Sequence, residues 1–165
     1  TTNLSLPNGF GSSATDMSGM FWGASLPTTG FSLPAGFGSA ALDMQVMFRD
    51  ANLPTTNFIL PSGFGSSATR MQSMFWDATL PDNFVLPAGF GSSATGMVAM
   101  FWGAKLNGDI DWSGTDLTAS AALKGDMFNG TTWNGHFVLA QNQDSVDWLI
   151  DGTGADATNV KIKGS

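Results

Sequence analysis

The stretch Ala14-Thr15-Asp16-Met17-Ser18-Gly19-Met20-Phe21-Trp22-Gly23-Ala24 returns along the chain with its two methionines and its phenylalanine in place. Four such copies and a weaker fifth end at phenylalanines spaced 27, 27, 26 and 27 positions apart: Phe21, Phe48, Phe75, Phe101 and Phe128. A fixed period of this length is typical of a solenoid, in which each unit buries its apolar side only against its neighbours. The repeat therefore predicts an architecture, but it does not name a ligand.

Composition excludes several classes of function. The chain has 6 Lys and Arg against 13 acidic residues, all of them Asp, and a net charge of -7. Nucleic-acid binding relies on clustered Lys and Arg, so no nucleic-acid partner is expected. The absence of Cys excludes disulfides and thiolate metal sites. No apolar run approaches the ~20 residues that span a bilayer, so we expect no membrane insertion.

Each unit opens with three residues whose first and third members are large and apolar. They are residues 4–6, 31–33, 58–60, 84–86, 110–112 and 137–139. Alternation with one constant face predicts a strand whose constant residues point inward. Strands stacked turn on turn would give a parallel sheet.

The motif itself predicts a helix. Met17, Met20, Phe21 and Ala24 fall at i, i+3, i+4 and i+7, the spacing of one helical face. Strand on one side and short helix on the other predict an α/β repeat solenoid, a leucine-rich-repeat-like right-handed coil. We expect one continuous domain, with five repeats of 26–27 residues over 1–136 and a degenerate C-terminal capping repeat over 137–165.

The two ends of the coil differ in sequence. Outward Lys161 on the last strand would guard it against edge-to-edge pairing, whereas residues 4–6 have no such guard. The chain also opens at Thr1 rather than Met. We interpret it as a mature product or a piece of a longer protein, with other domains or turns of a parent chain as partners.

A family resemblance rests on the recurring pattern Thr-x-Met-x-x-Met-Phe-x-x-Ala and on residues 107–113 leading to Met127 and Phe128. Over roughly residues 4–136 the chain resembles the BspA-like bacterial surface protein repeat. The resemblance implies a secreted or cell-surface protein that adheres to host or matrix molecules. Four of the five units depart from the family pattern, because Leu-Pro-x-Gly-Phe-Gly replaces an acidic, Trp-containing strand exit.

The outward positions of the predicted strands form the first candidate binding surface. They include Asn57, Ile59, Asn83, Val85, Asp109, Asp111, His136 and Val138, with Asn3, Ser5, Gly30 and Ser32 before them and Asn159 and Lys161 after them. Solenoids commonly bind through such a face, and an uncharged centre suits a protein or a glycan. The alternative is that these are tolerated solvent positions.

The second candidate surface is an aromatic stripe. Trp22, Arg49, Trp76 and Trp102 each follow a core phenylalanine and should point away from the core. Such a stripe predicts a platform for sugar or an interface with another domain. The alternative is that each Trp packs between neighbouring short helices.

Three other kinds of chemistry have weaker signals. Residues 109–116 resemble a calcium loop, but Ser120 stands where the bidentate acid belongs. Thr pairs at 1–2, 28–29 and 55–56 could form a flat ladder for an ordered surface. His136 has Asp109 one turn away, yet no nucleophile motif accompanies them. We expect no catalytic site, no metal and no cofactor.

The sequence therefore predicts an extracellular or cell-surface binding module, with adhesion to a protein or carbohydrate through the sheet face. The alternative is a structural spacer of a long surface protein, with no ligand of its own.

Overall fold

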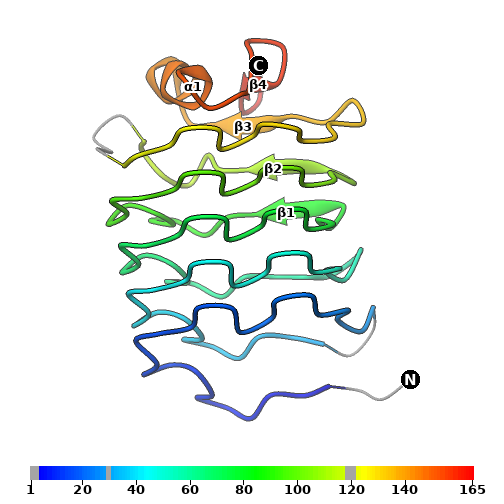
Figure 1. Cartoon of the computed structure of the whole chain (residues 1–165), viewed down its shortest axis with the longest axis vertical. Coiled ribbons are helices and arrows are strands. Elements are labelled where there is room, and N and C mark those ends of the chain that lie inside the picture. Colours follow the sequence, from blue (N-terminus) through cyan, green and yellow to red (C-terminus); the bar gives the residue numbers. More distant parts are fainter. Residues whose placement is uncertain (1–3, 29–30, 118–121) are drawn as a thin grey trace.

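The computed structural model describes residues 4–28, 31–117 and 122–165. The chain rises as a stack of similar turns, with the N-terminal turn at one end and the C-terminal segment closing the other (Figure 1). The regular elements are β1 (Asn83–Val85), β2 (Asp109–Asp111), β3 (Val138–Ala140), α1 (Gln143–Ile150) and β4 (Val160–Ile162). The four strands form one parallel sheet in the order β1-β2-β3-β4.

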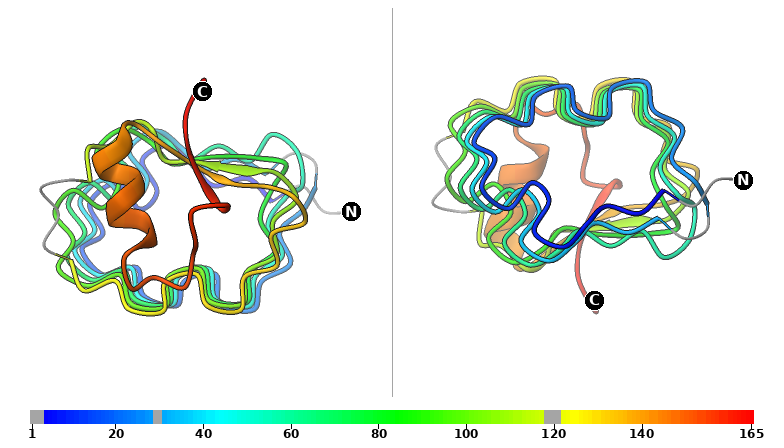
Figure 2. Two further views of the ribbon diagram at one scale, coloured as in Figure 1. Left: turned by 90° about the horizontal axis from the view of Figure 1, so that it is seen from above. Right: turned by 90° about the horizontal axis from the view of Figure 1, so that it is seen from below.

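The predicted fold class is wrong, because the leucine-rich-repeat-like helices are not there. In the described residues the structure has one small four-stranded sheet and the single helix α1. Residues 4–6, 31–33 and 58–60, which were predicted as strands, form none. The Met-Met-Phe segments instead form a wall of tight turns opposite the sheet, which we call the turn wall (Figure 2). It comprises residues 16–25, 43–52, 70–79, 96–105 and 123–132, joined at both edges by parallel bridges.

Hydrogen bonding explains why the turn wall is not helical. Within one turn the N–H of Trp22 donates to the carbonyl of Gly19, three residues back, rather than four. The N–H of Phe21 leaves its own turn and donates to the carbonyl of Met47 in the next one, at 2.8 Å. Alternate peptide groups thus tie neighbouring turns together, and the α-helical ladder cannot form.

Backbone dihedrals give the same explanation. Every fourth residue of the wall is left-handed, as in Gly19 (φ 62°), Gly23 (φ 66°), Val46 (φ 50°) and Asp50 (φ 56°). A left-handed residue cannot continue a right-handed helix. The side chains at positions i, i+3 and i+4 still point inward, because two consecutive β-turns return them to the same face of the wall.

Three columns of stacked phenylalanines fill the interior. Phe31 lies 6.3 Å from Phe58, and Phe58 lies 6.4 Å from Phe84, as rungs of one column. The second column is Phe10, Phe37, Phe64 and Phe90, and the third is Phe21, Phe48, Phe75, Phe101 and Phe128. Each buried ring contributes roughly 1.5–3 kcal/mol, so these columns dominate the stability of the stack.

Helix α1 and strand β4 close the C-terminal end. Asn142 caps α1 by accepting the N–H of Ser145 at 2.8 Å, and Val146 and Leu149 are buried beneath the helix. The N–H of Phe128 donates to the carbonyl of Thr153. Seen along the stack, α1 lies across one side of the end (Figure 2). Strand β4 pairs in parallel with β3 and so extends the sheet.

The register of β3 differs from the prediction. Ile110 pairs with Val138, 28 positions along the chain, and not with Phe137. A slip of one residue exchanges the two faces of a strand. Val138 is therefore fully buried, and its assignment to the outer face is wrong. Phe137 and Leu139, predicted to point inward, are half-exposed.

Candidate functional site

An exposed apolar pair lies where the sheet begins, with Val85 in the edge strand β1 and Ile59 in the turn before it. Ile59 is 74 % exposed and Val85, in the next turn, is 54 % exposed. Asn57 and Asn83, two residues before each of them, are also exposed. Phe58 and Phe84 stack at 6.4 Å, so Ile59 and Val85, which follow them, lie in neighbouring turns on one side, which we call the outer sheet face. Asn57 lies in the bend before Phe58, with φ 59°.

Towards the C-terminal end the outer sheet face becomes charged. Val85 pairs with Asp111, Asp111 with Leu139, and Leu139 with Lys161. The Nζ of Lys161 lies 3.3 Å from the ring centroid of Phe137. Leu139 and Phe137 were not predicted as surface residues. The sequence could have indicated their exposure in one way only. Val138 and Ala140 are also apolar and alternate, so they could have been chosen as the inward-facing pair in place of Phe137 and Leu139.

Asp111 is engaged within the chain rather than free for a ligand. Its Oδ2 accepts the Nζ of Lys163 at 2.6 Å, and its Oδ1 accepts the hydroxyl of Ser113 at 2.6 Å and the Ser113 N–H at 3.1 Å. Partial burial acts to raise the pKa of Asp111, but the bonds from Lys163 and Ser113 outweigh it and lower the pKa.

Asp109 and His136 meet at the edge of the same face. The Nδ1 of His136 lies 3.5 Å from Oδ1 of Asp109, and both side chains are at least one-third exposed. The same oxygen accepts the N–H of Phe137 at 2.9 Å. Asp109 thus holds the chain where it enters β3.

The predicted calcium loop is in part a strand, and the predicted threonine ladder falls partly outside the described residues. Asp109 and Asp111 belong to β2, and Ser120 lies outside the described residues. Within the described ranges no group of three or more His, Cys, Asp or Glu could hold a metal ion. Thr1, Thr2 and Thr29, like the sheet-face positions Asn3 and Gly30, also lie outside the described residues.

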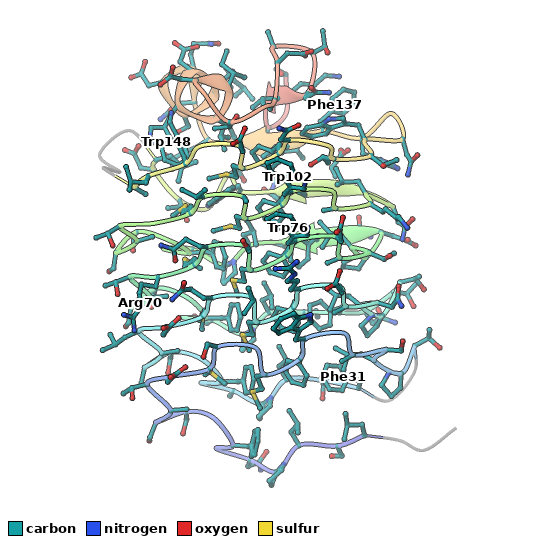
Figure 3. The ribbon with its side chains drawn as sticks, viewed as in Figure 1. Phe31, Arg70, Trp76, Trp102, Phe137 and Trp148 are labelled. Atoms are coloured by element: carbon teal, nitrogen blue, oxygen red, sulfur yellow. The ribbon has the colours of Figure 1, made fainter. Side chains whose placement is uncertain are left out.

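The predicted aromatic stripe forms one continuous stack along the turn wall. The guanidinium of Arg49 lies 5.3 Å from the ring centroid of Trp22 and 4.7 Å from that of Trp76. Trp76 and Trp102 stack at 5.1 Å with 13° between their planes, one above the other in Figure 3. The structure thus brings all four residues together, as the sequence pattern predicts.

Acidic side chains in the same wall accept the indole N–H groups of two of the three tryptophans. The Nε1 of Trp22 donates to Oδ2 of Asp50 at 3.0 Å, and that of Trp76 donates to Asp77 at 2.8 Å. The rings face one another, so mainly their edges remain at the surface. A sugar stacks on a ring face. Trp22, at the N-terminal end of the stack and 57 % exposed, offers the largest open ring surface of the four.

A hollow beside α1 is lined by Lys124, Asp144, Asp147, Trp148 and Asp151. The ammonium of Lys124 lies 4.5 Å from the Trp148 ring centroid, donates to the Trp148 carbonyl, and lies 3.3 Å from Oδ2 of Asp151. Trp148 is labelled beside α1 in Figure 3. These contacts fasten α1 to the fifth turn.

No helix in the described part of the chain has the length and apolar character to cross a membrane. Comparison of the chain with protein-family models, with curated proteins and with solved structures finds no match.

Proposed function

We propose that this protein is an extracellular binding or adhesion module that recognises a protein or a carbohydrate through its outer sheet face. The observation that supports this most is the pair Ile59 and Val85, which lie in consecutive turns and are 74 % and 54 % exposed. Apolar side chains that gather on an otherwise polar surface often mark an interaction site. Asn57 and Asn83 flank them and offer amide donors and acceptors.

The aromatic stack is a less suitable site for the primary ligand. Its ring faces contact one another, and the Nε1 atoms of Trp22 and Trp76 already donate to Asp50 and Asp77. A ligand would have to compete with these contacts. The outer sheet face needs no such rearrangement.

Display at a cell surface is part of the same proposal. It rests on the resemblance to BspA-like surface repeats in the pattern Thr-x-Met-x-x-Met-Phe-x-x-Ala. Other domains of a longer parent chain would carry the anchor.

The experiment is a screen of the full chain against immobilised matrix proteins and a glycan array, repeated with a double variant, Ile59→Asp with Val85→Asp. Both positions are exposed, so folding should be unchanged. Two desolvated carboxylates should weaken binding to any captured ligand by about tenfold or more.

The matched control is Leu42→Asp with Leu123→Asp. These leucines are 49 % and 70 % exposed but lie away from the outer sheet face, close to the edge of the turn wall. The control should bind like the wild type. If the control loses binding and the sheet variant does not, the outer sheet face is not the site.

A spacer role is the second candidate, and the uninterrupted phenylalanine columns favour it because they make a stiff stack. A spacer should capture no ligand in either screen, and neither double variant should change that result.

A further inference from the structure

The described residues leave the N-terminal end of the stack uncovered. In the first turn Phe10 is 39 % exposed and Met20 is 37 % exposed, whereas their counterparts one turn later, Phe37 and Met47, are fully buried. Phe10, Met17 and Met20 line a hollow at this end. Figure 1 shows the turn at the bottom of the stack, with no element of the described chain beneath it.

The backbone of this end is unpaired in a regular pattern. At the next level up, the carbonyls of Asp43, Met47 and Asn52 accept N–H groups from the first turn at 2.8–3.0 Å. Two further carbonyls, of Gln45 and Arg49, do the same. The matching carbonyls of the first turn receive no hydrogen bond from any described residue: Asp16, Ser18, Met20, Trp22 and Ser25.

The side-chain packing between turns adds a steric requirement. The ring of Phe37 lies over Gly11, where a Cβ would come within 2.8 Å of the ring. The same arrangement holds for Phe64 over Gly38 and for Phe90 over Gly65, at 2.7 and 2.8 Å. Whatever covers Phe10 in this way must therefore present a glycine at the corresponding place.

We propose that the open end docks one further turn of the same repeat, joined to the N-terminal side of the chain. Such a turn supplies N–H donors at the spacing of the five free carbonyls, a glycine beneath Phe10, and a side chain to stack under Trp22. Within the stack, alternate wall N–H groups of one turn donate to the carbonyls of the next turn towards the C-terminus. The added turn must therefore lie on the N-terminal side and point the same way along the stack.

A second copy of the chain does not fit the open end. Two open ends face to face would set carbonyl rows against carbonyl rows. The opposite end of a second copy is closed, because the N–H groups of Asp126 and Phe128 already donate to Gly152 and Thr153. Its α1 would also lie in the way.

The experiment replaces residues 1–3 with a copy of residues 31–57, which likewise ends in Thr-Thr-Asn. The added turn should raise Tm by several degrees, because each new interface adds a nearest-neighbour term to a stacked repeat. Hydrogen exchange gives a local readout. The amides of Thr15 and Ser25, whose counterparts Leu42 and Asn52 donate downward to the first turn, should exchange at least about tenfold more slowly.

The matched control is the same extended chain with the copied Gly38 changed to Leu. Its side chain would occupy the place of the Phe10 ring, so the rise in Tm and the amide protection should both be lost. Equal results for the two extended chains would overturn the proposal, and so would an extended chain without protection. A wild-type chain that dimerises in sedimentation with Thr15 and Ser25 protected would also overturn it. None of these measurements depends on a ligand, so they are independent of the proposed binding function.

Discussion

At the scale of single residues, Asp111 ties the last turns of the sheet together. Its carboxylate joins Lys163 at the end of the chain to Ser113 at the exit of β2. The ion pair reaches across Leu139, whose strand lies between the two partners. One side chain therefore contributes to holding the C-terminal segment on the stack.

The lowered pKa of Asp111 gives this contact a pH dependence. Because the folded-state pKa lies below the unfolded value of about 3.9, the stabilisation is present above about pH 4 and is lost as the pH falls through the folded pKa. Asp111→Asn should lower the free energy of unfolding at pH 7 by up to about 1 kcal/mol, since the pair is partly exposed. In urea titrations the difference from wild type should shrink towards pH 2. Asp82→Asn removes a charge from another exposed position and serves as the control. A difference that stays constant with pH would contradict the assignment.

At the scale of elements, the turn wall depends on left-handed residues at fixed places. Glycine is suited to them, and Asp tolerates them, but Val46 is β-branched and has φ 50°. A left-handed L-residue costs roughly 1–2 kcal/mol, so Val46 is a point of strain in an otherwise regular wall.

Val46→Gly should therefore stabilise the protein by about 1 kcal/mol, despite the added freedom of the unfolded chain. Val98, in the same wall and also partly exposed, is not left-handed. Val98→Gly should destabilise by about 0.5–1 kcal/mol. Thermal unfolding of the two variants should shift in opposite directions. A lower Tm for Val46→Gly would contradict the role assigned to its dihedral angle.

The turn wall also shows what the sequence could predict of an element. The inward positions of Met44, Met47 and Phe48 follow from their spacing and are fully buried. The helix does not follow, because two consecutive β-turns return side chains to the same face at the same intervals. A usable signal was the restriction of one position to Gly or Asp: Gly23, Asp50, Asp77, Gly103 and Gly130.

At the scale of the whole molecule, stability comes from rings that are far apart in sequence and stacked in space. Phe64 is fully buried, with Phe37 and Phe90 each 6.2 Å away. Phe10, at the open end of the same column, has Phe37 on one side only and is 39 % exposed.

Phe64→Ala should cost about 3–5 kcal/mol, because it leaves a cavity between two turns. Phe10→Ala should cost less than half as much, because solvent already reaches that ring. Urea unfolding followed by tryptophan fluorescence measures both. Equal losses would mean that the columns are not the main source of stability.

The candidate site was predictable only in part. The stack of Trp22, Arg49, Trp76 and Trp102 follows from the period alone, since residues one period apart lie over one another. The exposed pair Ile59 and Val85 follows from alternation. The burial of Val138 could not be predicted from alternation, because it depends on the 28 positions that separate it from its partner Ile110.

Turns of different length share the same core. The outward residues of β1, β2 and β3 are all odd-numbered, because paired residues lie 26 and 28 positions apart. Phe31, Phe58 and Phe84 are spaced 27 and 26 positions apart, yet all three are buried in one column. A connecting loop can therefore gain or lose one amino acid without turning its rung inside out, so repeats can vary in length while their rings stay aligned.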